Sequence, residues 1–155
     1  MMCSMEETPS KGTMIVFDSS FLIALLNKRD RHYHSALRFL DDMATFDYGS
    51  RVTIDYVLDE VLTLIWSSTL DRNLVKQAYD LICATPEFLR CYRVEVEILQ
   101  QAWDTWLKIA SPNRPLSFTD ACILAFAKRE ENENNTMVYI ATFDNDCRGI
   151  AATVP

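Results

Sequence analysis

The stretch MIVFDSSFLIALL, residues 14–26, decides the fold class of this chain. It begins with four apolar residues, 14–17, which is typical of a buried parallel strand. The Asp-Ser-Ser at 18–20 offers three helix-capping residues, and the apolar residues 21–26 continue as a helix. The stretch therefore predicts a strand that leads directly into a helix.

The same alternation continues along the chain. We predict further strands at 48–54, 88–94, 136–142 and 149–154, and further helices at 30–44, 56–69, 71–84, 95–110 and 117–130. Residues 130–135 indicate a solvated polar linker, and residues 1–13 a disordered tail that leaves one domain over 14–155. Strands separated by helices indicate the α/β class, with a mostly parallel central sheet of four or five strands.

Composition excludes several classes of protein. A mean hydropathy of -0.04 and the lack of a long uncharged apolar run argue against a membrane span. Five scattered cysteines without a C-x-x-C pair suit free thiols better than disulfides or a zinc site, and the acidic N-terminus does not resemble a signal peptide. We therefore expect a cytoplasmic protein. The net charge of -7 disfavours sequence-independent coating of nucleic acid, and it suits the docking of a basic partner segment.

Three acidic residues lie where an α/β fold binds its ligands, outside the carboxyl ends of the strands. Asp18 follows the first predicted strand and Asp144 follows the strand at 136–142, while Asp120 lies in the first turn of the helix from Ser117. Each has an ordinary structural explanation as well. Asp18 could cap its helix, and Asp120 could close a capping box with Ser117. Asp144 could belong to an Asp-rich turn.

Glu60 is a fourth candidate. In the predicted helix 56–69 it shares a face with Val57 and Val61, and an acid inside an apolar stripe is costly to bury unless its charge is compensated. The alternative is that Glu60 or its neighbour Asp59 lies at the edge of that stripe. Four acids gathered at one rim of a sheet would repel one another unless a cation neutralised them. With only two histidines in the chain, we expect a hard cation held by oxygen, Mg²⁺ or Mn²⁺.

Four segments together resemble the motifs of the PIN-domain family: VFDSSFLIAL (16–25), TIDYVLDE (53–60), SFTDA (117–121) and ATFDND (141–146). The second is most similar to archaeal members, and the order, spacing and short length are similar to the VapC toxins of toxin–antitoxin pairs. The resemblance implies a three-layer α/β/α fold and a metal-dependent endoribonuclease, the toxin of a VapBC-type pair. A VapB-like antitoxin is the partner that it implies, besides RNA.

Carried over by position, the resemblance assigns the catalytic metal site to Asp18, Glu60, Asp120 and Asp144. Asp146 would be an auxiliary acid. Ser19 and Thr142 would be hydroxyls that steady the carboxylates or a water. The site would use its cation to activate a water for in-line attack on the phosphodiester.

Basic residues in loops near the predicted rim are candidates to hold RNA phosphates, with solvated surface charge as the alternative for each: Lys28, Arg29, Arg31, Arg114 and Arg148. His34 falls where the family often has a histidine, and we interpret it as structural. Cys147 stands where many VapC toxins have an aromatic or aliphatic residue, which we expect to alter the packing under the site and leave the acids intact.

Two other functions stay open for this sequence. The fold could serve as an RNA-binding or partner-binding module without significant catalysis, or as a housekeeping RNA-processing nuclease. A receiver domain or phosphatase is disfavoured, because the chain lacks a lysine near the last strand and a D-x-D-x-T motif. Aromatic residues on the helices with Trp66, Trp103 and Trp106 would suit a homodimer face, although ordinary core packing explains them equally well.

Overall fold

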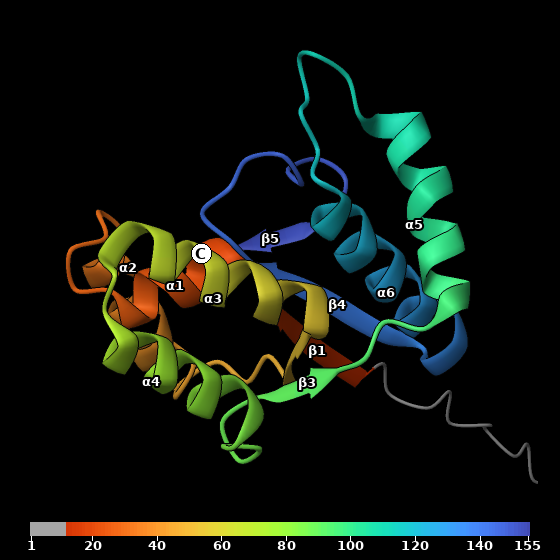
Figure 1. Cartoon of the computed structure of the whole chain (residues 1–155). Coiled ribbons are helices and arrows are strands. Elements are labelled where there is room, and N and C mark those ends of the chain that lie inside the picture. Colours follow the sequence, from red (N-terminus) through yellow and green to blue (C-terminus); the bar gives the residue numbers. More distant parts are fainter. Residues whose placement is uncertain (1–11) are drawn as a thin grey trace, which may run out of the picture.

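The computed structural model describes residues 12–155, and in this range the chain forms a five-stranded sheet with six helices (Figure 1). The elements are β1 (Gly12–Phe17), α1 (Ser19–Leu26), α2 (Tyr33–Asp42), β2 (Ser50–Ile54), α3 (Asp55–Thr69), α4 (Arg72–Cys83), β3 (Arg90–Tyr92), α5 (Val96–Ile109), α6 (Phe118–Asn134), β4 (Thr136–Ala141) and β5 (Ala152–Val154). Neighbouring strands all pair in parallel, in the order β3-β2-β1-β4-β5. The predicted α/β class with a parallel sheet is confirmed.

Two groups of helices cover the sheet. Helices α1 to α4 pack on one another, whereas α5 packs along α6, and α6 lies against β4. Figure 1 shows the two groups on either side of the central strands. The strand order explains this arrangement, because the chain moves outward from β1 to β3 and then returns across the sheet to β4. Right-handed crossovers in opposite directions place their helices on opposite faces, which confirms the three-layer fold.

Strands β1 and β4 form the centre of the sheet and fix where the candidate site lies. Their register pairs Phe17 with Ala141, so the two strands end at the same level. The backbone N–H of Asp18 donates to the carbonyl of Ala141 at 3.0 Å, which continues the pairing by one residue. Asp18 and Thr142, the residues after the two strands, therefore emerge side by side at the carboxyl edge of the sheet.

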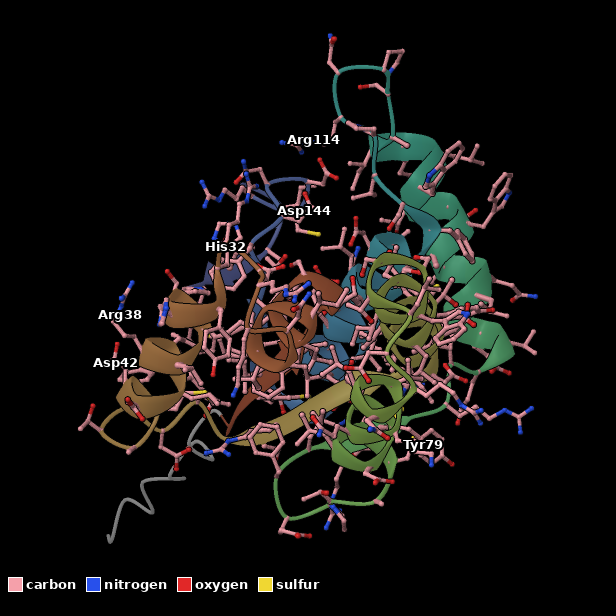
Figure 2. The ribbon with its side chains drawn as sticks, turned by 60° about the vertical axis from the view of Figure 1, so that its left-hand side comes forward. His32, Arg38, Asp42, Tyr79, Arg114 and Asp144 are labelled. Atoms are coloured by element: carbon pink, nitrogen blue, oxygen red, sulfur yellow. The ribbon has the colours of Figure 1, made fainter. Side chains whose placement is uncertain are left out.

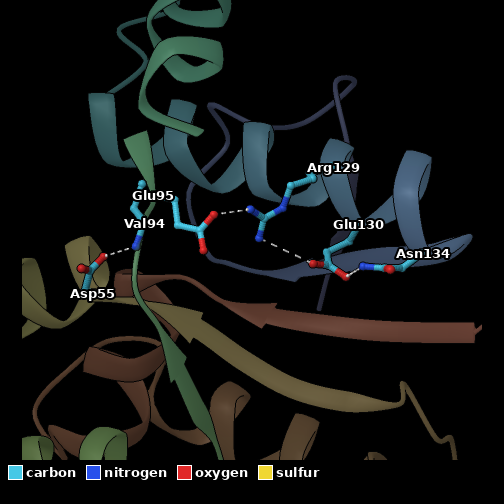
Figure 3. A network of polar contacts seen from close by, with 6 residues as sticks. All are labelled: Asp55, Val94, Glu95, Arg129, Glu130 and Asn134. Atoms are coloured by element: carbon cyan, nitrogen blue, oxygen red, sulfur yellow. Dashed lines mark hydrogen bonds and ion pairs between the residues drawn. The ribbon is translucent and has the colours of Figure 1, made fainter. Parts of the chain in front are cut away.

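The predicted linker at 130–135 is wrong, because α6 continues to Asn134. Its polar residues lie on the exposed part of the helix, and the amide of Asn134 donates to Glu130 Oε2 at 2.8 Å, one helical turn away. Arg129 pairs with both Glu95 and Glu130, which ties α6 to the start of α5 (Figure 3). The helix ends at Asn135, whose φ of 48° is left-handed.

Other element boundaries differ from the prediction as well, and the strands predicted at 88–94 and 149–154 are shorter, at Arg90–Tyr92 and Ala152–Val154. β1 begins at Gly12, two residues earlier than predicted. β2 begins at Ser50, because Gly49 has a φ of 81° and lies against the backbone of Thr13, where a β-carbon would meet the carbonyl oxygen at 1.9 Å. Helix α2 begins at Tyr33 rather than at residue 30.

Residues 1–11, most of the predicted tail, lie outside the described range. Within residues 12–155, no helix is both long enough and apolar enough to cross a membrane.

Candidate metal centre

Asp18 lies at the N-terminus of α1, yet its carboxylate does not cap that helix. It accepts hydrogen bonds from Thr142 Oγ1 at 2.8 Å and Ser20 Oγ at 3.2 Å, and a longer one from Ser19 Oγ at 3.4 Å. The side chain is buried with only 4% of the residue exposed. The capping explanation for Asp18 is therefore excluded, and its carboxylate is instead fixed by three hydroxyls.

The hydroxyls of Ser20 and Thr142 join the turn after β1 to the turn after β4. Their oxygens are 3.1 Å apart. Ser20 Oγ accepts the backbone N–H of Phe143 at 3.0 Å, and Thr142 Oγ1 accepts that of Asp144 at 3.0 Å. The sequence prediction included Ser19 and Thr142 but missed Ser20. Ser20 could have been noticed as a second hydroxyl beside Asp18, although its capping chemistry offered a sufficient explanation.

Asp120, Asp144 and Asp146 bring carboxylate oxygens to within 4.8 Å of one another. Asp120 is 6% exposed, whereas Asp144 is exposed and Asp146 is partly buried. Asp120 also closes the predicted capping box, since its backbone N–H donates to Ser117 Oγ at 3.0 Å and its Oδ2 accepts the N–H of Ser117 at 3.4 Å. Asp120 thus both caps its helix and belongs to the acid cluster.

Glu60 faces the same region from α3. It is partly buried, and it lines an open cavity of about 570 Å³ together with Asp144 and Asp146. The other residues that line this cavity are Ser19, Ser20, Ile23, Asp30, Arg31, His32, Leu64, Phe143 and Asn145. Asp59 is exposed and does not line it. The structure thus brings Glu60, and not its neighbour, to the acids.

Burial and mutual repulsion raise the pKa values of these acids. The pKa of Asp120 rises to about 7, chiefly because the carboxyl is buried and further because of the charge on Asp18. Burial also raises the pKa of Asp18 and of Glu60, and the charge of Asp144 adds to both. For Asp146 burial and Asp144 raise the pKa, and the Arg114 guanidinium partly opposes them.

No ion pair within residues 12–155 neutralises this cluster. The salt bridges in this range join Arg129 to Glu95 and to Glu130, on the far side of α6 from the acids. Arg114 offsets the charge only in part, at Asp146, and without an ion pair. A crowded group of carboxylates with so little compensating charge is the environment in which a bound metal ion lowers the electrostatic cost.

The sequence model of the PIN domain matches residues 15–152, nearly all of the described chain. The chain belongs to the PIN domain family. A comparison with curated protein sequences gave no match.

Solved structures of VapC toxins have the same fold as this PIN domain. VapC20 of Mycobacterium tuberculosis, described as a sarcin-ricin loop cleaving toxin, superposes with a TM-score of 0.66 at 25% identity, over 85% of this chain and 91% of that one. A toxin–antitoxin complex from Klebsiella pneumoniae gives 0.61 at 16% identity, over 91% and 96%. VapBC2 of Rickettsia felis, bound to a DNA fragment, gives 0.61 at 12% identity, over 91% and 97%. The resemblance to VapC toxins is confirmed.

The basic residues of this PIN domain differ in their distance from the acids. Arg31 lines the acid cavity. Arg114 lies over the loop after β4, where its Nη2 donates to the carbonyl of Arg148 at 3.2 Å (Figure 2). The side chains of Lys28, Arg29 and Arg148 are exposed, and none of the three lines the cavity.

The histidine beside the site is His32 and not His34. His32 lines the cavity and stacks on Phe143, with ring centroids 4.3 Å apart. His34, which we interpret as structural, is exposed on α2, contacts the ring of Tyr33 and does not line the cavity. The sequence prediction missed His32. The reason is that the predicted helix from residue 30 included residue 32, whereas α2 begins at Tyr33.

Cys147 is buried under the acid cluster. Burial raises the pKa of its thiol, and the charges of Asp120 and Asp18 raise it further. The thiol is therefore neutral at physiological pH and packs as a small apolar group.

Proposed function

We propose that this PIN domain is a metal-dependent endoribonuclease and the toxin of a toxin–antitoxin pair. One observation carries the proposal: acids from four separate segments of the chain lie close together, and none forms an ion pair in residues 12–155. Asp120, Asp144 and Asp146 bring carboxylate oxygens within 4.8 Å of one another, Glu60 and Asp144 line the same cavity, and the charge of Asp18 raises the pKa of both Asp120 and Glu60. The similarity to VapC20 at 25% identity supports RNA as the substrate, since that protein is described as a sarcin-ricin loop cleaving toxin.

The donor set fits Mg²⁺ or Mn²⁺. Asp120, Asp144 and Asp146 supply carboxylate oxygens within reach of one ion, and hard cations prefer such oxygens. Asp18 and Glu60 complete the proposed set, with Glu60 either aiding that ion or holding a second one. When bound, the ion would activate a water and stabilise charge on the phosphate.

The chain's own residues would do the positioning. Thr142 and Ser20 hold Asp18 in one orientation, so its carboxylate need not reorganise during the reaction. Arg31 lines the cavity, and Arg114 lies close enough to Asp146 to lower its pKa. Both would bind the phosphates of the RNA chain. Hydrolysis of the phosphodiester at this site would leave a 5′-phosphate on one product.

The test is cleavage of labelled RNA by the Asp18→Asn and Asp120→Asn variants, with Mg²⁺ and with Mn²⁺. Both variants should lose metal-dependent cleavage. Asp42→Asn is the matched control, because Asp42 is an exposed acid on α2 that lies away from Asp144 (Figure 2). Its rate should equal that of the wild type. Cleavage at the wild-type rate by either active-site variant would show that the assignment is wrong.

Metal binding is tested separately by thermal melting. Mn²⁺ that binds only the folded state should raise the melting temperature of the wild type and of Asp42→Asn. It should raise that of Asp120→Asn much less. If Mn²⁺ stabilises the wild type but no RNA is cut, the fold is a binding module and not a nuclease.

The partners belong to the same proposal. The similar solved structures include toxin–antitoxin complexes, which supports a small antitoxin, and a short reading frame beside the gene would encode it.

A homodimer is proposed from the exposed apolar side chains on α3 and α5: Leu64, Trp66, Val96, Trp103 and Leu107. Sedimentation at several concentrations tests the dimer, and a monomer at high concentration would exclude it. We propose a cytoplasmic location, where the free cysteines of the described range would remain reduced.

A further inference from the structure

A stack of aromatic rings leads from the core to the rim of the acid cavity. Phe17 stacks on Phe21 with centroids 5.0 Å apart, and Phe21 stacks on Phe143 at 5.8 Å. Phe143 in turn stacks on His32 at 4.3 Å, with 2° between the ring planes. Phe17 and Phe21 are fully buried, whereas Phe143 and His32 are partly buried and line the cavity. The aromatic stack, these four rings, therefore ends at the cavity.

His32 is held in one orientation without a ligand. Its backbone N–H donates to Asp30 Oδ1 at 2.8 Å, which fixes the turn before α2. Its ring Nε2 accepts a hydrogen bond from Arg31 Nε at 3.0 Å. Stacking on Phe143 thus fixes one face of the imidazole ring, and the hydrogen bond from Arg31 fixes its edge. Arg31 also lines the cavity with its positive charge.

The end of the stack is coupled to the acids through the chain itself. Phe143 stands between Thr142, which binds Asp18, and Asp144, which belongs to the carboxylate cluster. Ser20 Oγ accepts the backbone N–H of Phe143 at 3.0 Å, so the ring is fixed relative to Asp18 as well. An aromatic surface beside a phosphate-binding site is an arrangement that suits a nucleotide.

Phe143 has Phe21 stacked against one face and His32 against the other, so His32 is the ring that ends the stack. We propose that the outer face of His32, backed by Phe143, is a stacking platform for one unpaired base of the RNA, next to the phosphate that is cut. This inference rests on the proposed function and adds the substrate class to it. A base inside a duplex has both faces covered by its neighbours, so the platform selects RNA that is single-stranded or looped at the cleavage position. Arg31, hydrogen-bonded to the His32 ring, then binds the phosphate of the same nucleotide.

The experiment measures binding in the full-length Asp120→Asn background, so that cleavage does not consume the RNA. The probe is a short fluorescein-labelled single-stranded RNA, and its fluorescence anisotropy is followed in the presence of Mn²⁺. His32→Ala should weaken binding by about five- to a hundredfold, the range for loss of one base–aromatic stack. The matched control is His34→Ala, which changes an exposed histidine two residues further on, in α2, and it should leave binding unchanged.

Two further measurements separate stacking from other roles of His32. His32→Phe keeps an aromatic face and loses the ring nitrogens, so it should restore most of the binding. A series of RNAs, each with one abasic nucleotide, identifies the base that stacks. At one position, loss of the base should weaken binding to the parent protein. At that same position it should cause no further loss of binding in His32→Ala. The same sequence in a blunt duplex should bind more weakly than the single strand. Circular dichroism checks that each variant is folded.

Equal binding by His32→Ala and His34→Ala would overturn the platform. So would failure of His32→Phe to restore binding, which would assign the role to the ring nitrogens. The proposed function fails differently: the wild type would then cut no RNA with either metal, whatever the anisotropy shows. If Asp18→Asn abolishes cleavage and His32→Ala changes neither binding nor rate, only the platform is lost.

Discussion

Thr142 and Asp18 are separated by 124 residues in the sequence, and a single hydrogen bond of 2.8 Å joins Thr142 Oγ1 to Asp18 Oδ2 at the base of the acid site. A hydroxyl has one proton to donate. If Thr142 gives it to Asp18, the same oxygen is left to accept the backbone N–H of Asp144 at 3.0 Å. The Thr142 side chain thus orients the Asp18 carboxylate, which follows β1, and also the loop that carries Asp144.

Thr142→Val removes that hydroxyl and keeps the shape of the side chain. The buried Asp18 carboxylate loses a donor, which should cost about 1–3 kcal/mol of folding stability. Mn²⁺ affinity should fall by about 10–100-fold, the usual effect of removing a residue that orients a metal ligand. Calorimetric titration with Mn²⁺ and thermal melting measure the two effects.

Thr53→Val is the matched control for that change. Thr53 Oγ1 donates to the carbonyl of Phe17 at 2.7 Å, and the residue is as deeply buried as Thr142 but touches none of the acids. Its loss should reduce stability by a similar amount and leave Mn²⁺ affinity unchanged. Equal losses of Mn²⁺ affinity in the two variants would mean that the effect of Thr142 is one of general stability.

The sheet and the position of the acids could be predicted from local pattern. The apolar runs at 14–17 and 136–142 are buried strands, and parallel strands bring their carboxyl ends to one edge. Asp18 and Asp144 follow those ends, so the pattern places both at the same edge. Their proximity further depends on β1 and β4 being neighbours, which the sequence pattern did not predict. Glu60 was predictable because helical periodicity places it on the face with Val57 and Val61, which are both fully buried.

The hydrogen-bond partners within the site could not be predicted from the sequence. The link from Ser20 to Thr142 depends on the register of two strands more than a hundred residues apart in sequence, and no local pattern encodes it. His32 reaches the cavity because α2 begins at Tyr33, which leaves residues 30–32 in a turn stabilised by Asp30. The sequence predicted a helix from residue 30, and this prediction placed His32 inside the helix rather than in the turn before it.

The raised pKa of Asp120 predicts how metal-free stability depends on pH. Its ordinary pKa is near 4, so between about pH 4 and about 7 the folded state keeps a proton that the unfolded state has lost. Stability should therefore fall as pH rises through this window and then level off. Asp18 and Glu60, whose pKa values are also raised, act in the same direction. Thermal melting in EDTA measures this trend.

Asp120→Asn is the variant that isolates the contribution of Asp120. It should flatten the pH dependence and raise metal-free stability above about pH 7 by roughly 2–4 kcal/mol. In the wild type, Mn²⁺ must displace the proton, so its affinity should rise with pH through about 7 and binding should release protons. A wild-type melting temperature that stays constant over this range, or the same pH profile in both proteins, contradicts the assignment.

Glu60 and Asp59 are adjacent acids, one in the cavity and one on the surface, so their variants can be compared directly. Glu60→Gln removes a charge that lines the cavity, whereas Asp59→Asn removes one that is exposed. Glu60→Gln should reduce RNA cleavage and weaken Mn²⁺ binding by about tenfold or more, since a carboxylate ligand is lost. Asp59→Asn should change neither. The two variants differ from the wild type by the same charge, so similar effects in both would indicate long-range electrostatics and not a role in the site.

Arg114 should contribute to RNA binding through contact with a phosphate. Its guanidinium donates to the carbonyl of Arg148 and lies close enough to lower the pKa of Asp146, which places a positive charge at the rim of the site. Arg114→Gln should weaken RNA binding about equally across sequences and reduce the slope of log affinity against log salt by about one. Arg38→Gln is the control, because Arg38 is an exposed arginine on α2 away from Asp144 (Figure 2). Since both changes lower the net charge by the same amount, an identical salt slope for the two variants would mean that RNA senses only the overall charge of the protein and does not contact Arg114.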